Sequence, residues 1–313
     1  MTSRPLGIDA LLVLMAIIWG SNYVIIKHAF RELDPQAFNA IRMVVASAVF
    51  LASMTAIRNL PAARRANGSF ASIFYTPSPI NGRDWLGLVG LGVVGQGLYQ
   101  YWFVGGLAAT SVSNSALILA FTPVLIGLVG AALGIERVTS MHWLGALLSL
   151  AGIYLVVGRG MSVGGSTLRG DLTMFAAVCC WAIYTLGSRP LMLRHSPVTV
   201  TGLSMAIGTA FYLPAVSSHI RAVKWSAVSS GTWVAAVYSA LFALCVSYTI
   251  WYAAVREIGS ARTSAYSNVV PLVAMTTAVI FLGEPLDLRK IAGAAAVLIG
   301  VALTRVKIVS PPE

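Results

Sequence analysis

Long apolar segments separated by short polar connections run through the whole chain of 313 residues. A helix needs about 20 apolar residues to cross the hydrocarbon core of a membrane. We predict ten membrane-spanning helices, over residues 8–28, 36–57, 85–104, 111–133, 142–158, 171–188, 197–217, 226–254, 262–282 and 288–306. Barrel strands alternate apolar and polar positions, which these segments do not. The predicted fold class is therefore an all-α integral membrane protein.

The first half of the chain recurs in the second half. Large aromatic residues, prolines and glutamates return in the same order, first at an offset of 149 positions and then at 148. The matching pairs are Tyr99 and Tyr248, Trp102 and Trp251, Pro123 and Pro271, and Glu136 and Glu284. Trp19 and Trp181 also match, but 162 positions apart, because the loop 58–84 is longer than its counterpart. We predict two repeats, residues 1–158 and 165–306.

Each predicted repeat contains five spans, and an odd number makes the second repeat enter the membrane upside down relative to the first. The repeats are then inverted, related by an axis in the membrane plane. Lys and Arg favour cytoplasmic loops. With the N-terminus inside, most basic residues of the first half lie in the cytoplasm, namely Arg4, Arg58, Arg64, Arg65, Arg83 and Arg137. We predict a multi-pass protein of the inner (plasma) membrane with both termini cytoplasmic.

Composition agrees with this assignment. The chain is 58% hydrophobic and 10% charged, with a mean hydropathy of +0.82, whereas a soluble domain has about 25% charged residues. A net charge of +11 is compatible with nucleic-acid binding, but the basic residues stand singly at the ends of apolar segments, so we predict no nucleic-acid partner. The three cysteines lie inside apolar segments, without the spacing of a disulfide framework or a metal site. The first apolar segment continues too far, without a cleavage site of small residues, to be a removable signal peptide.

Polar and aromatic residues gather in a subset of the predicted spans. Polar groups at membrane depth are costly and usually face an interior or water, so we predict that these residues line a central cavity for a small-molecule substrate. The predicted lining is Trp19, Asn22, Gln96, Tyr99, Trp102, Asn114, Trp181, Tyr184, Tyr248, Trp251, Tyr266 and Asn268. The alternative for the aromatic residues is interfacial anchoring or core packing.

Pro123 and Pro271 lie inside predicted spans. A proline removes a backbone hydrogen bond and kinks a helix, which would leave the carbonyls of Leu119 and Ser267 without their usual partner. Such breaks provide polar backbone and a hinge in transporters. A static kink is the alternative.

Two basic residues lie within spans or at their edges. Arg42 is inside the second span, where it either pairs with a carboxylate or binds the carboxylate of a substrate. Lys27 is near the outer end of the first span and either contacts substrate or extends to the membrane surface. Each of the ten acidic residues is predicted in a loop, a tail or the first turn of a span. That pattern disfavours a proton relay through a buried carboxylate. We therefore predict a uniporter, in which the gradient of the substrate itself drives its movement.

A combination of short motifs runs through nearly the whole chain. It consists of Trp19-Gly20-Ser21-Asn22, Lys27, Arg42, Pro123 with Glu136, and Pro271 followed by Leu282-Gly283-Glu284-Pro285. In this order the chain resembles the EamA-type drug/metabolite transporters. The resemblance implies ten spans in two inverted halves around a cavity lined mostly by the third, fourth, eighth and ninth spans. The aromatic third and eighth spans are similar to exporters of aromatic and other amino acids.

The function predicted is export of small neutral or zwitterionic metabolites, with amino acids, including aromatic ones, as first choice. The alternative within the superfamily is a carrier of nucleotide sugars or phosphorylated metabolites. The alternative of another class is an intramembrane enzyme. Gly202-Leu203-Ser204-Met205 resembles a serine protease motif, but all four histidines lie at span ends or in loops.

We predict no cofactor and no metal. The partners expected are the substrate and the lipid bilayer, with monomer and homodimer as alternatives.

Overall fold

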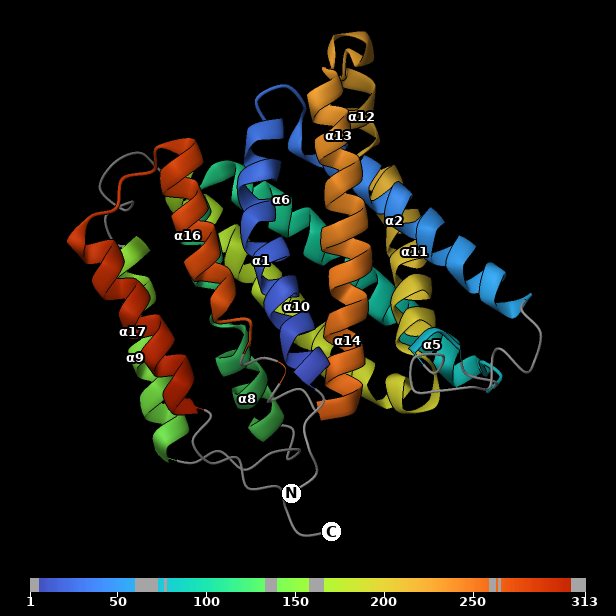
Figure 1. The fold of residues 1–313 in the computed structure, drawn as a ribbon, viewed down its shortest axis with the longest axis horizontal. Coiled ribbons are helices and arrows are strands. Elements are labelled where there is room, and N and C mark those ends of the chain that lie inside the picture. Colours follow the sequence, from blue (N-terminus) through green and yellow to red (C-terminus); the bar gives the residue numbers. More distant parts are fainter. Residues whose placement is uncertain are drawn as a thin grey trace.

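The computed structural model of the protein describes residues 6–59, 73–75, 78–132, 140–157, 166–258, 263 and 266–304. These residues form helices and contain no strand. The helical segments, labelled as in Figure 1, are α1 (Leu6–Ala29), α2 (Pro35–Arg58), α5 (Gly82–Leu91), η1 (Gly92–Leu98), α6 (Tyr99–Ala109), α7 (Val112–Leu119), α8 (Thr122–Ala132), α9 (Ser140–Val157), α10 (Ser166–Arg194), α11 (Pro197–Ala215), α12 (Ser217–Ala222), η3 (Trp225–Ala227), α13 (Ser230–Tyr238), η4 (Ser239–Val246), α14 (Ser247–Ile258), α16 (Val269–Leu282) and α17 (Leu288–Thr304).

Several of these helices have the length and composition of membrane spans. Six of the described helices are long and apolar enough to cross a membrane, over Gly7–Ala29, Pro35–Arg58, Val112–Ala132, Leu168–Arg194, Pro197–Ala215 and Ser230–Ile258. Shorter apolar helices cover Trp143–Leu155 and Val269–Leu282. Large apolar side chains such as Leu147, Phe281 and Leu288 are exposed on the outer surface, where lipid rather than water suits them. The chain is therefore a multi-pass helical membrane protein.

Local sequence explains where the helices begin and end. Asp34 caps α2, because its carboxylate accepts hydrogen bonds from the backbone N–H groups of Gln36 and Ala37. Asn81 and Asp84 form a reciprocal capping box at the start of α5. At the end of α16 the chain turns through Gly283, whose φ of 65° favours glycine.

The third and eighth predicted spans each contain a wide π-helical stretch. The third is built from α5, η1 and α6 in direct succession, and the eighth from α13, η4 and α14. The π segments Gly92–Leu98 and Ser239–Val246 lie at matching places in the two halves. Such π segments are rare and occur frequently at functional sites.

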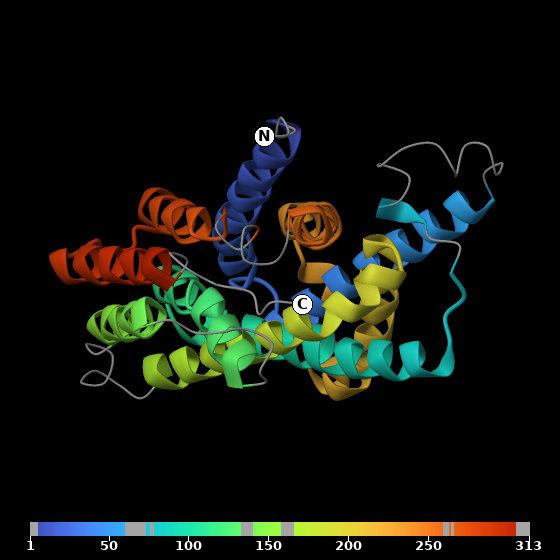
Figure 2. The same cartoon turned by 90° about the horizontal axis from the view of Figure 1, so that it is seen from below.

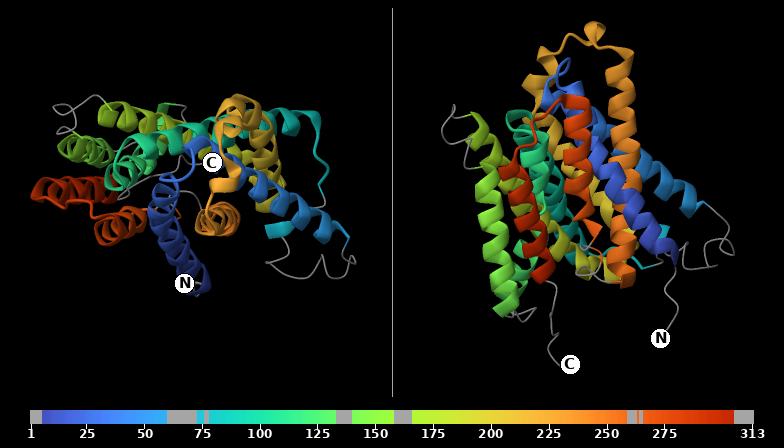
Figure 3. Two further views of the ribbon diagram at one scale, coloured as in Figure 1. Left: turned by 90° about the horizontal axis from the view of Figure 1, so that it is seen from above. Right: turned by 60° about the vertical axis from the view of Figure 1, so that its left-hand side comes forward.

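The helices form an elongated bundle. Figure 1 shows the start of α1 and the end of α17 at the same end of the bundle. In Figure 2, α9, α16 and α17 form one side of the molecule, and α2, α5 and α11 form the other. The views in Figure 3 confirm that α9 and α17 run side by side. Within the bundle, α6 packs against α10, and α1 packs against α16.

Close contact between α1 and α16 depends on Gly20. A Cβ atom at this position would lie 2.5 Å from Cβ of Val273 and 2.9 Å from the carbonyl oxygen of Val270. The absence of a side chain lets the two backbones approach, as small residues do in membrane helices. The neighbouring Trp19 contributes to the wall of the central cavity.

Candidate functional site

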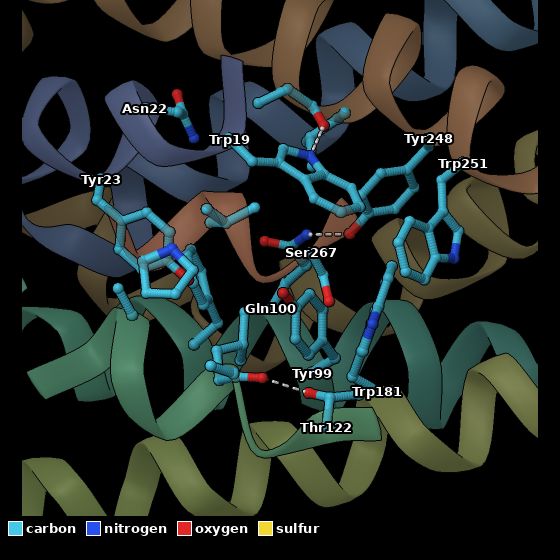
Figure 4. A pocket seen from close by; sticks show the side chains of 18 of the residues that line it. Trp19, Asn22, Tyr23, Tyr99, Gln100, Thr122, Trp181, Tyr248, Trp251 and Ser267 are labelled. Carbon is cyan, nitrogen blue, oxygen red and sulfur yellow. Dashed lines mark hydrogen bonds between the residues drawn. The ribbon is translucent and has the colours of Figure 1, made fainter. Parts of the chain in front are cut away.

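A cavity lies in the middle of the bundle, with about 70 Å³ of space open to water-sized molecules. Its described walls come from α1, α2, α6, α7, α8, α10, η4, α14 and the start of α16. Seven aromatic side chains line it, namely Trp19, Tyr23, Tyr99, Phe103, Trp181, Tyr248 and Trp251 (Figure 4).

The two tryptophans that match across the repeat meet in this cavity. The rings of Trp19 and Trp181 are edge to face, with centroids 6.1 Å apart and an interplanar angle of 83°. Tyr248 contacts both of them, at centroid distances of 6.0 and 5.4 Å. The Trp19 indole Nε1–H donates a hydrogen bond of 2.9 Å to the carbonyl of Ala243 in η4, so the π segment holds one wall of the cavity in place (Figure 4).

Several polar atoms of the lining residues are buried and lack a hydrogen-bond partner in the described part of the chain. They belong to Asn22, Tyr23, Gln100 and Trp251. The Gln100 amide does donate one bond of 3.3 Å to the hydroxyl of Tyr248, which leaves its other atom unpaired. Buried polar groups without partners are costly, so these atoms are available to a ligand.

Arg42 contributes the one basic side chain among the described residues that line the cavity. It is 1% exposed, and its Nη1 donates a hydrogen bond of 2.9 Å to Oδ1 of Asn39 on the same helix. Its Nε has no partner among the described residues. The structure thus places an arginine without a carboxylate partner beside the aromatic side chains.

Lys27 lies elsewhere. Its amine donates three hydrogen bonds, to the carbonyls of Leu107, Ala108 and Thr110 at the end of α6, at 2.6, 2.9 and 2.8 Å. A lysine ammonium has three donors, and a cation is favourable at a helix C-terminus. The structure therefore gives Lys27 a structural contact in place of the predicted contact with substrate.

Glu284 completes the corner where α6 leads into α7. Its carboxylate accepts hydrogen bonds from the backbone N–H groups of Val112 and Ser113 at 2.7 and 3.2 Å, and from the Ser113 hydroxyl at 2.6 Å. Glu284 therefore caps the start of a helix from the other half of the chain. Its match in the repeat, Glu136, is outside the described residues.

The prediction that every acidic residue lies in a loop, a tail or the first turn of a span is wrong for Asp171. Helix α10 begins at Ser166, so Asp171 is more than a turn inside the helix, and it is buried. Its carboxylate accepts a hydrogen bond of 2.6 Å from the hydroxyl of Thr110 and longer bonds of 3.4 Å from the amide of Asn114. Asn114, predicted in the cavity, is directed to this carboxylate instead.

Further predicted lining residues also lie outside this cavity. Trp102 borders a separate surface hollow beside Arg169 and Leu172. The Tyr184 hydroxyl shares a hydrogen bond of 2.8 Å with Ser204, and Tyr266 donates one of 2.6 Å to Asp9. The remaining two do not line the cavity either, namely Gln96, which is fully buried, and Asn268, at the start of α16.

Tyr99 and Trp102 were both predicted to line the cavity, whereas α6 contributes Tyr99, Gln100 and Phe103 to it. Spacings of three and four residues both place side chains on a common face. The apolar character of Phe103 gave no sign that it belonged to a site. The signal that could have found this face is the spacing of Tyr99, Gln100 and Phe103 along the helix.

Both prolines line the cavity, but they lie in the first turn of a helix, where proline is well tolerated. Pro123 is the second residue of α8, after a break that follows the end of α7. The carbonyl of Leu119, expected to lose its usual partner, accepts a hydrogen bond of 2.6 Å from the Thr122 hydroxyl. That of Ser267 accepts one from the backbone N–H of Val270 at 3.1 Å. Both carbonyls therefore have a substitute donor, and the helix break is present.

The sequence similarity of the chain to known proteins shows its family. The sequence profile of the EamA-like transporter family matches residues 6–158 and again residues 168–306. The chain belongs to this family. It is 26% identical over 301 residues to the uncharacterized transporter YyaM of Bacillus subtilis, covering 95% of this chain and 93% of YyaM. It is 22% identical over 308 residues to the "Probable amino-acid metabolite efflux pump" of Salmonella typhimurium, covering 96% and 94% of the two chains.

A solved crystal structure supports the fold of this EamA-family chain. It aligns with a TM-score of 0.61 at 20% sequence identity, over 94% of this chain and 96% of the other. At this identity the likeness concerns the fold alone. The family match and the apolar helices identify the protein as a membrane transporter.

Proposed function

We propose that this EamA-family transporter exports small metabolites, first among them amino acids, including aromatic ones, by alternating access. The observation that carries the proposal is the cavity with aromatic walls and one buried guanidinium. Aromatic side chains present large flat surfaces to an apolar substrate body, and the guanidinium suits a carboxylate. The Salmonella relative, described as an amino-acid metabolite efflux pump, points in the same direction.

The proposed architecture is ten spans in two inverted repeats, residues 1–158 and 165–306. Contacts between matching residues support it. Ser47 and Thr209 share a hydrogen bond of 2.9 Å and are 162 positions apart. The Ser149 hydroxyl donates to the carbonyl of Val297, 148 positions later, at 3.3 Å. These are the offsets of the repeat in the sequence, and two residues related by a two-fold axis can touch only at that axis.

The proposed topology places both termini in the cytoplasm of a cell with the protein in its inner (plasma) membrane. The distribution of Lys and Arg in the first half supports this orientation. The corner held by Lys27 and Glu284 is then at the outer end, where it joins α1, α6, α7 and α16. Opening of this corner, with bending at the breaks beside Pro123 and Pro271, is the proposed route of release.

The proposed energetics is uniport, in which the metabolite gradient drives export. The described residues that line the cavity include no carboxylate and no histidine, and these are the groups that ordinarily titrate in a proton-coupled pathway. Asp171 is buried, but its hydrogen bonds hold the α6–α7 corner. A phosphorylated or nucleotide-sugar substrate would require more cationic groups than Arg42 alone.

Transport by the purified protein in liposomes tests the proposal. We expect saturable uptake and counterflow of labelled amino acids from a panel that includes phenylalanine, tyrosine and tryptophan. An imposed pH gradient or sodium gradient should not drive accumulation above the external concentration. Accumulation under either gradient would refute uniport, and absence of any saturable uptake across the panel would refute the substrate class.

A further inference from the structure

The cavity has an unbalanced charge. Among the described residues that line it, Arg42 supplies a guanidinium and no residue supplies a carboxylate. Arginine stays protonated at any physiological pH. A ligand in this cavity therefore faces a net positive protein charge inside the membrane, where water does not screen it.

The surroundings of Arg42 leave its charge without an anion. The bond from Nη1 to Asn39 is to a neutral amide, at 2.9 Å, and the guanidinium carbon lies 6.0 Å from the centroid of the Phe38 ring. Nε is buried and has no hydrogen-bond partner among the described residues. A buried charge without a partner is strongly unfavourable, and a bound carboxylate would accept from the free side of the guanidinium.

The described carboxylates that are buried or hydrogen-bonded have other partners. Asp9 accepts from Tyr266, Asp84 from Arg194, and Asp171 from Thr110. Asp34, Asp287, Glu32 and Glu284 accept hydrogen bonds at or near helix starts. Glu257 is exposed on the surface. The described residues therefore place no negative charge in the cavity to receive an ammonium group.

The aromatic rings offer an ammonium group a weaker alternative. A cation over a tryptophan or tyrosine face is attracted by the ring, and six such rings from the described residues line the cavity. That attraction offsets only a part of the free energy of removing an ammonium from water. A substrate without the ammonium avoids this cost and keeps the contact with Arg42.

We propose that the cavity selects organic monoanions, with a carboxylate on an aromatic or apolar body and no ammonium group, over zwitterionic amino acids. Arg42 binds the carboxylate, and the aromatic side chains bind the body. The unpaired polar atoms of Asn22, Tyr23 and Trp251 accommodate a neutral polar substituent. The inference rests on the proposed transport function and places organic monoanions before amino acids among its substrates.

Two probes of the same size separate the alternatives. Phenylpyruvate and phenylalanine share a carboxylate and a benzyl group and differ in a keto or an ammonium substituent. Uptake and counterflow are measured with the full chain in liposomes, beside protein-free liposomes that report passive leak. We expect a KM for phenylpyruvate at least about tenfold below that for phenylalanine. Because the monoanion carries charge through a uniporter, a potassium–valinomycin potential, positive inside, should accelerate its uptake and leave phenylalanine uptake unchanged.

Variants of Arg42 test whether this residue causes the preference for phenylpyruvate over phenylalanine. Arg42→Gln should remove most of the preference for phenylpyruvate, whereas Arg42→Lys, which keeps the charge, should retain a part of it. Trp102→Leu, outside the cavity, is the control. If Arg42→Gln does not fold, competition between the two probes on the wild-type protein decides the question alone. Equal or stronger transport of phenylalanine would overturn the inference and leave the proposed function intact. Saturable transport of neither probe, nor of any amino acid in the panel, would overturn both.

Discussion

The hydroxyls of Ser47 and Thr209 share a hydrogen bond of 2.9 Å between α2 and α11. The distance along the chain, 162 positions, equals that between Trp19 and Trp181. A second contact of this kind joins α9 to α17, through Ser149 and Val297. Both contacts join helices that match in the repeat. At two interfaces, corresponding helices of the two halves therefore pack against each other.

The α9–α17 interface yields a first prediction, which concerns Gly152. A Cβ atom there would lie 2.7 Å from the carbonyl oxygen of Gly293 and 2.8 Å from the backbone nitrogen of Val297. These backbone atoms cannot move aside as a flexible side chain would. We expect Gly152→Ala to lower the free energy of unfolding by about 1–3 kcal/mol, measured by denaturant or thermal unfolding in detergent.

Gly90→Ala is the matched control, because a Cβ atom at Gly90 of α5 meets nothing within 4 Å. Alanine has the higher helix propensity, so this variant should be as stable as the wild type or slightly more stable. Equal stability of the two variants would show that α9 and α17 do not pack this closely.

The approximate helical ranges could be predicted because the length of an apolar segment by itself indicates a membrane-spanning helix. Trp19 and Trp181 could be predicted in the cavity because their match across the repeat is visible in the sequence. The π segments η1 and η4 could not, since a change in backbone hydrogen bonding leaves no characteristic residue pattern. The segment η1 immediately precedes the cavity-lining stretch that begins at Tyr99, and η4 itself lines the cavity through Ala243 and Leu244. The helix faces presented to the cavity could therefore not be predicted either.

Some predicted site residues lie outside the cavity for a second reason. Their hydrogen-bond partners belong to distant parts of the chain. Lys27 meets carbonyls about 80 positions away, and Asn114 meets Asp171. From their polarity and position in the membrane, Asn114 was predicted to line the cavity, and Lys27 was predicted either to contact substrate or to extend to the membrane surface. Polarity predicts that such a residue needs a partner, but whether the partner is the protein or the substrate depends on which helices are neighbours.

A second prediction contrasts Tyr99 with Trp102. The Tyr99 ring lies in the cavity, 5.0 Å from that of Trp181, whereas Trp102 borders a surface hollow. We expect Tyr99→Leu to reduce the ratio Vmax/KM for transport about tenfold, as the loss of an aromatic contact implies. Trp102→Leu should stay near the wild-type ratio. Similar losses in both variants, at equal amounts of folded protein, would contradict this description of the cavity.

A third prediction concerns pH and the loop between α1 and α2. Hydrogen bonds from Ser229 and Thr232 lower the pKa of the Glu32 carboxyl below its ordinary value. A lowered pKa in the folded state stabilises the protein above the ordinary pKa, and the stabilisation disappears as pH falls through the folded-state value. We therefore expect Glu32→Gln to lower Tm slightly at pH 7 and to match the wild type in strong acid.

Thermal unfolding of the two proteins across that pH range measures the effect as a difference, which removes contributions from other acidic groups. Glu257→Gln is the control, because Glu257 is also exposed. A Tm difference between Glu32→Gln and wild type that persists unchanged in strong acid would show that the carboxylate charge is not its cause.

The last prediction concerns the α6–α7 corner. Replacing Lys27 by methionine keeps much of the side-chain length but leaves the carbonyls of Leu107, Ala108 and Thr110 without their donor. A half-buried acceptor that loses its partner costs about 1–3 kcal/mol. We expect Lys27→Met to lower stability by that order and to slow maximal transport through the loosened corner. Lys27→Arg, which keeps a cation at the helix end, should recover most of the stability.

Because Lys27 does not reach the cavity, the ratio of KM values between two substrates should stay at its wild-type value in both variants. A shift of that ratio, as expected for Arg42→Gln, would instead make Lys27 a substrate contact.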